Sequence, residues 1–128
     1  MINLSLEEAL MKEGFIITSF KGTSMNPLFL EGRDKVYIVK KTSKLKRGDV
    51  ALYKRSNGQF VLHRVIKVCT DEYLMCGDNQ AIPESGITDS QIIAVVSKFK
   101  INGILYSKDS KKLILRVKVK FAYALNVK

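Results

Sequence analysis

Residues 50–68 read VALYKRSNGQFVLHRVIKV and carry the pattern that decides the fold. Two runs rich in β-forming residues, 50–53 and 60–68, flank Ser56, Asn57 and Gly58, a triplet typical of a tight turn. Within the second run, alternation places Val61, His63 and Val65 on one face, and the residues between them on the other. The stretch therefore predicts an antiparallel β-hairpin with the histidine on its more apolar face.

Similar strand-like runs lie on both sides of this hairpin, separated by turn signals. They cover residues 15–20, 35–39, 73–76, 92–99 and 104–106. Ahead of them, Ser5 and Glu8 have capping-box spacing and Gly14 is a typical helix end, so a short helix is expected there. We therefore expect a mainly β, antiparallel fold with one short N-terminal helix.

The expected organisation is a single domain, since 128 residues fit one core and not two. It divides into the N-terminal helix (1–14), a β-rich core (15–106) and a basic C-terminal element (107–128). In that last element, hydrophobic residues alternate with basic ones as in a strand, yet Ile114, Val117, Phe121 and Leu125 also form a helical stripe. Both conformations remain open.

Composition and charge indicate which partners, cellular location and cofactors to expect. The chain has 22 Lys+Arg against 12 Asp+Glu, a net charge of +10 that suits an acidic partner or an anionic surface. It has no run of apolar residues long enough to span a membrane, and its acidic start is unlike a signal peptide, so a cytoplasmic protein, also able to lie at a membrane, is expected. Its two cysteines lack the close spacing of a zinc site, so no metal and no cofactor are expected.

Three segments contain side chains suited to chemistry. The single histidine, His63, is one candidate base. Ser24 lies between Gly22 and Pro27, and the segment Gly77–Asp78–Asn79 is followed by Asp89. Taken alone, each has a structural interpretation, as a core histidine or as turn residues.

The order of these segments resembles that of the signal peptidase and LexA-type serine peptidase family. The matching pieces are a G-x-S-M-x-P-x-L box from Gly22 to Leu28, Gly48-Asp49-Val50, His63-Arg64-Val65, Gly77-Asp78-Asn79 and Asp89-Ser90. The resemblance covers about residues 15–97. It implies a serine peptidase on a β-rich fold.

The resemblance implies roles for individual residues. Ser24 matches the nucleophile, and His63 matches the histidine base of the endoplasmic-reticulum and archaeal enzymes. Asp89 is the better match for the supporting carboxylate, because it occupies the downstream position before a serine. Asp78 is the alternative, since residues 80–88 look like an insertion and leave the choice of aspartate open. Near the nucleophile, the backbone of Met25 would bind the oxyanion, Thr23 is a candidate extra hydroxyl and Pro27 would stiffen the turn, while Gly77 and Asn79 would shape the adjoining loop.

The expected function is that of a serine endopeptidase that cleaves a peptide or protein precursor of the signal- or leader-peptide type. A histidine base with an ordinary pKa near 6.5 would lose activity as the pH falls through that value. The expected partner is the precursor, with an anionic membrane surface as a further candidate, and DNA is not expected. Two alternatives stay open: an inactive, peptide-binding relative and a basic β-barrel that binds nucleic acid.

Overall fold

The computed structural model describes residues 6–19, 25 and 30–110. In that part of the chain, one helix and a short 3-10 turn accompany eight strands. Their bounds are α1 (Leu6–Glu13), β1 (Phe15–Thr18), β2 (Lys35–Lys40), β3 (Val50–Lys54), β4 (Phe60–Val68), β5 (Tyr73–Cys76), β6 (Glu84–Ile87), the 3-10 turn η1 (Asp89–Gln91), β7 (Ile92–Ile101) and β8 (Ile104–Ser107).

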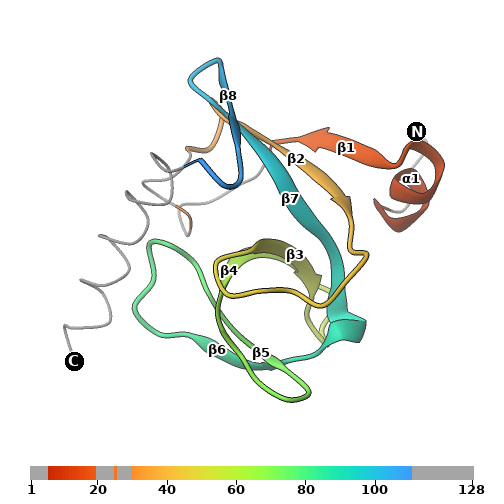
Figure 1. Ribbon diagram of the computed structural model, residues 1–128, viewed down its shortest axis with the longest axis vertical. Coiled ribbons are helices and arrows are strands. Elements are labelled where there is room, and N and C mark those ends of the chain that lie inside the picture. The colour runs from red at the N-terminus through yellow and green to blue at the C-terminus, as the bar shows by residue number, and fades with distance from the viewer. Residues whose placement is uncertain (1–5, 20–24, 26–29, 111–128) are drawn as a thin grey trace.

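All the strand pairs are antiparallel, and the strands follow the order β1-β2-β7-β3-β4-β5-β6, with β8 paired to β7. The long strand β7 lies between β2 and β3 and so joins the β1–β2 part of the sheet to the β3–β6 part (Figure 1). The mainly antiparallel β fold with one short helix is confirmed.

The hairpin at residues 50–68 forms as its sequence predicts. Strands β3 and β4 pair from Val50–Arg64 to Lys54–Phe60. In the turn, Gly58 has a φ of +90°, a conformation that only glycine adopts easily, and the Gly58 N–H donates to the Arg55 carbonyl oxygen. Gly14 ends the N-terminal helix as predicted: its N–H donates to the Leu10 carbonyl oxygen at the end of α1.

Alternation along the central strands sends side chains into two separate cores. On β3, Val50 belongs to one buried cluster, whereas Ala51 and Tyr53 belong to the other. On β4, Val61 and Val65 join the Tyr53 cluster, while Leu62 packs against the first. Because His63 alternates in step with the two valines, it lies on the Tyr53 side of the sheet.

Strand β6 was not predicted from the sequence. Its residues, ESGI, show no alternation of apolar and polar side chains, and only Ile87 is buried. It forms the end of the sheet by pairing with β5. The predicted cap Ser5, residue 20 of the first predicted strand and the C-terminal segment from residue 111 lie outside the described residues. None of the helices described is long and apolar enough to cross a membrane.

Candidate active site

His63 lies in the middle of β4, directly opposite Ala51 of β3, and only 4% of its surface is exposed. Tyr53 stands two residues further along β3 and therefore on the same face. The Nδ1 atom of His63 is 3.1 Å from the Tyr53 hydroxyl oxygen, and the two rings meet edge to face with centroids 6.0 Å apart. The hairpin thus buries the histidine and holds one edge of its ring against a tyrosine.

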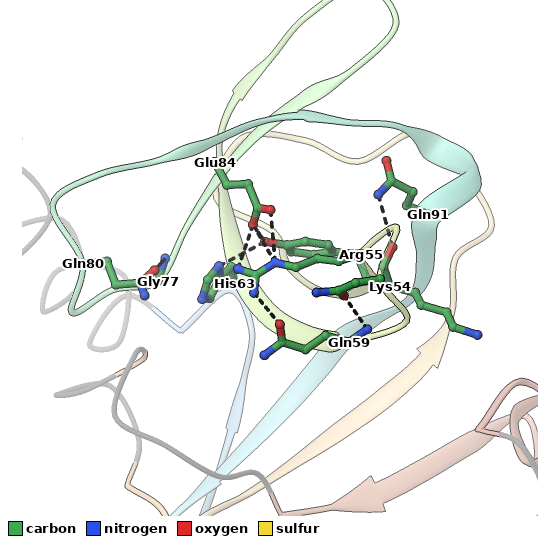
Figure 2. A network of polar contacts seen from close by, with 10 residues as sticks. Lys54, Arg55, Gln59, His63, Gly77, Gln80, Glu84 and Gln91 are labelled. Carbon is green, nitrogen blue, oxygen red and sulfur yellow. Dashed lines mark hydrogen bonds and ion pairs between the residues drawn. The ribbon is translucent and has the colours of Figure 1, made fainter.

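The Tyr53 hydroxyl has a second partner, the carboxylate of Glu84 at the start of β6. It donates to Glu84 Oε1 over 2.6 Å. Arg55 contacts the same carboxylate through Nε and Nη2, at 3.1 and 3.0 Å, and its Nη1 donates to Gln59 (Figure 2). The β3–β4 hairpin and the more distant strand β6 therefore build one polar network beside His63.

The pKa shifts in this network fix the charge of each member. Burial and the contact with Glu84 raise the pKa of Tyr53, so its hydroxyl keeps its proton. Although burial acts in the opposite direction, the hydrogen bonds from Arg55 and Tyr53 lower the pKa of Glu84. Glu84 is therefore an ionised acceptor at neutral pH.

These charges determine where His63 carries its proton. An ionised carboxylate can only accept, so the single hydroxyl hydrogen of Tyr53 is committed to Glu84. The Tyr53 oxygen then accepts from His63, which requires a proton on Nδ1 and leaves a lone pair on Nε2. Burial, together with the charge of Arg55, lowers the pKa of His63 to about 4, while Glu84 acts in the opposite direction. His63 is thus a neutral base at pH 7, with Nε2 as its basic atom.

Asp78 belongs to a different set of contacts, built on the opposite face of β4. Its carboxylate accepts from Arg64 Nε and Nη2 at 2.8 and 3.0 Å, and only 2% of the residue is exposed. Its backbone N–H approaches the Sδ atom of buried Met25 to 3.4 Å. Since Arg64 follows His63 and Met25 follows Ser24 in the sequence, this cluster connects the neighbours of two candidate catalytic residues.

Asp89 is held elsewhere, in η1. It accepts a short hydrogen bond from the Tyr73 hydroxyl and pairs with Lys41 at 3.3 Å, and both contacts lower its pKa. Among the residues described, neither Asp78 nor Asp89 hydrogen-bonds to His63. Asp78 does not reach His63 because side chains alternate along β4: its partner Arg64 points away from the face that holds the histidine ring.

Of the other predicted site residues, the structure describes Gly77 and Asn79. Gly77 is buried and accepts from the Gln80 N–H at 2.9 Å, which closes a turn around exposed Asn79. Ser24, Thr23 and Pro27 lie outside the described residues, so their roles stay predictions.

The sequence analysis did not predict the roles of Tyr53 and Glu84, the two groups nearest to His63 in this network. Each could have been suggested by its position in the sequence. In the hairpin register, Tyr53 is the aromatic residue on the histidine face of β3. Glu84 is the single acidic residue between Asp78 and Asp89.

In the described part of the chain, no cluster of His, Cys, Asp and Glu could hold a metal ion. Cys69 and Cys76 are free thiols, and burial raises the pKa of Cys76. Cys76 donates to the Gln80 carbonyl oxygen, a contact that belongs to the Gly77–Gln80 turn.

A mainly antiparallel β fold with one short helix is consistent with an S24-like peptidase fold. The family model described as Peptidase S24-like matches residues 3–103, most of the chain. The protein belongs to this family, which confirms the resemblance seen in the sequence motifs. No curated protein is similar enough to the chain to count as a match.

Proposed function

We propose that the protein is a serine endopeptidase in which Ser24 is the nucleophile and His63 the general base, and that it cleaves a peptide or protein precursor. One observation carries the proposal: His63 Nδ1 lies against the Tyr53 hydroxyl, whose hydrogen is donated to Glu84. This arrangement favours a proton on Nδ1 and an unprotonated Nε2. A serine hydroxyl becomes an effective nucleophile only when such a base removes its proton.

The reaction follows from this assignment. His63 Nε2 takes the proton of Ser24 as the serine oxygen bonds to the scissile carbonyl carbon. The imidazolium then gives the proton to the leaving amine nitrogen as the C–N bond breaks, and a water molecule, activated by the same base, releases the acyl group. Backbone N–H groups at Ser24 and Met25 would stabilise the oxyanion, each by about 3 kcal/mol.

The contacts around Asp78 support bringing the two groups together. Arg64 fixes Asp78, and Asp78 in turn contacts Met25, so the residue after His63 is linked to the residue after Ser24 through two steps. Arg64 also donates to the Gly48 carbonyl oxygen at 2.7 Å, which ties the start of β3 to the same cluster. Asp78 is on this account a positioning residue rather than a member of the proton relay.

The partner is suggested by the charge of one sheet face. Strands β1, β2, β7 and β8 contain no acidic residue, and three of their four lysines, Lys35, Lys98 and Lys100, lie on this face. Across them, Ile17, Tyr37, Lys98 and Ser107 are direct neighbours, as are Lys35, Lys100 and Leu105. The aliphatic and aromatic residues Phe15, Ile17 and Leu105 are 49, 45 and 50% exposed on these strands.

This face, here called the basic face, combines exposed apolar side chains with lysines, and an anionic membrane surface offers the matching chemistry. Its side of the sheet continues from Phe15 through Val39, Val95 and Ala51 to His63, because these residues are successive cross-strand neighbours. We propose that the peptidase works at such a surface on a membrane-bound precursor.

The test is cleavage of a peptide library with small residues at varied positions, read by mass spectrometry. Ser24→Ala and His63→Ala are expected to abolish cleavage while circular dichroism shows an unchanged fold. Ser56→Ala, in the exposed turn of the hairpin, is the matched control and should retain full activity. Cleavage that survives Ser24→Ala would overturn the proposal, and peptide binding without cleavage by the unaltered protein would favour an inactive, peptide-binding relative.

A further inference from the structure

We infer that Glu84, acting through the hydroxyl group of Tyr53, selects the tautomer of His63 and stabilises its protonated form during the reaction. The inference rests on the proposed function of His63 as a base. It assigns the role expected of an aspartate to a tyrosine–glutamate pair, and both members are positioning residues because neither is proposed to touch the substrate.

The geometry forms a continuous chain of polar atoms from three strands. His63 Nδ1 lies 3.1 Å from the Tyr53 hydroxyl oxygen, which lies 2.6 Å from Glu84 Oε1. Tyr53 is completely buried and His63 nearly so, so little water competes for either bond. Glu84 is anchored in turn by Arg55, which contacts both carboxylate oxygens.

The direction of these hydrogen bonds depends on Glu84. With the carboxylate present, the Tyr53 hydrogen points to Glu84 and the Tyr53 oxygen accepts from His63 Nδ1–H. Without an acceptor at residue 84, the same hydroxyl is free to donate to Nδ1. A neutral imidazole whose Nδ1 accepts must carry its proton on Nε2, which removes the lone pair that a serine would need.

The network also holds opposing charges near the ring. The groups that act on His63 are Tyr53 in direct contact, anionic Glu84 and cationic Arg55. When His63 takes up a proton during catalysis, Glu84 becomes the nearest anion of this group and lowers the cost of the buried positive charge. Arg55 anchors that anion and at the same time opposes protonation at rest.

The experiment uses the fact that the chain has a single histidine. Two-bond ¹H–¹⁵N spectra of tag-free protein at neutral pH report which ring nitrogen of His63 is protonated, without any need for assignment. We expect a proton on Nδ1 in the unaltered protein and in Glu84→Gln, whose amide oxygen still accepts from Tyr53. In Glu84→Ala the proton should move to Nε2.

Peptide cleavage supplies the second measurement. Glu84→Ala should lower kcat by roughly 100-fold or more with little change in KM, because general-base catalysis contributes about 10²- to 10⁴-fold. The kcat of Glu84→Gln should lie between those of Glu84→Ala and the unaltered protein. Asp89→Asn, which alters the other candidate carboxylate, is the matched control and should leave the tautomer unchanged.

An unchanged Nδ1 proton in Glu84→Ala would overturn the inference, and a tautomer that moves equally in Asp89→Asn would do so as well. If Glu84→Ala does not fold, Tyr53→Phe replaces it, and retention of the pure Nδ1–H tautomer in that variant would be equally contradictory. Because the spectra do not depend on catalysis, a protein that fails to cleave any peptide but shows the expected tautomers would refute the proposed function and leave the relay standing.

Discussion

The hydroxyl oxygen of Tyr53 lies between the ring of His63 and the carboxylate of Glu84, at 3.1 and 2.6 Å. This position makes the tyrosine the link between a buried histidine and a charge on β6, the end strand of the sheet.

The first prediction concerns the pH dependence of cleavage. An ordinary histidine would lose its basic form below about pH 6.5, but burial and Arg55 lower the pKa of His63 to about 4. We therefore expect kcat/KM to stay level from pH 8 to about pH 5 and to fall tenfold per pH unit below about pH 4. The expectation from the sequence, a fall near the ordinary value, is thereby revised.

Arg55→Gln provides the comparison, because it removes a positive charge that opposes protonation. The acid limb of its profile and the NMR titration of the His63 ring should both move to higher pH. An acid limb that stays in place would show that Arg55 does not act on the ring.

The second prediction concerns stability in acid. The pKa of His63 is lower in the folded protein, about 4, than in the unfolded chain, about 6.5. The unfolded state therefore binds more protons within this window, and stability present above pH 6.5 is lost as the pH falls toward 4. The loss should reach roughly 3 kcal/mol, since one pKa unit corresponds to about 1.4 kcal/mol.

Urea unfolding at neutral pH and at several points between pH 6.5 and 4 measures this loss, and His63→Gln should flatten the dependence in that window. The acidic groups with lowered pKa, Glu84 and Asp34 among them, act at lower pH, because an ordinary carboxyl group titrates near 4. A His63→Gln variant with the same pH dependence as the unaltered protein would contradict the prediction.

The strands could be predicted because their apolar residues alternate with polar ones, and the turns because they contain Gly, Asn and Asp. Strand β6 could not be predicted in this way, since Glu84-Ser85-Gly86 shows no alternation of apolar and polar residues. Its Gly86 is typical of a turn rather than of a strand. The buried position of His63 follows from its alternation with Val61 and Val65. The place of Tyr53 on the same face follows from the hairpin register, whereas the contact between Tyr53 and Glu84 does not, because it depends on where β6 joins the sheet.

The third prediction concerns the Arg64–Asp78 pair. Their side chains are 12 and 2% exposed, and removal of one partner leaves a buried charge without its counterion. Asp78→Ala should lower the free energy of unfolding by roughly 3 kcal/mol, the scale found for broken buried pairs. It should also lower kcat, since Arg64 would no longer fix the segment whose backbone N–H, at residue 78, contacts Met25.

The matched control is Lys108→Ala, which breaks the more exposed pair of Lys108 and Asp49, at 3.6 Å. A change below about 1 kcal/mol is expected there. Urea unfolding of both variants provides the comparison, and equal losses would contradict the importance assigned to burial of the Asp78 pair.

The last prediction concerns the basic face. Lys98 and Lys100 lie on β7, next to Tyr37 and Lys35 of β2, where no acidic side chain occurs within the strands. Binding to phosphatidylcholine vesicles should require added phosphatidylglycerol and weaken with salt.

The double variant Lys98→Glu/Lys100→Glu should weaken this binding at least about 30-fold, because each lysine near an anionic surface contributes about 1 kcal/mol. Lys46→Glu/Lys67→Glu, at exposed positions on other segments, makes the same change in net charge and should have much less effect. Equal losses in the two variants would show that net charge alone governs binding, and strong binding to acidic peptides but not to vesicles would replace the membrane with an acidic segment of the precursor.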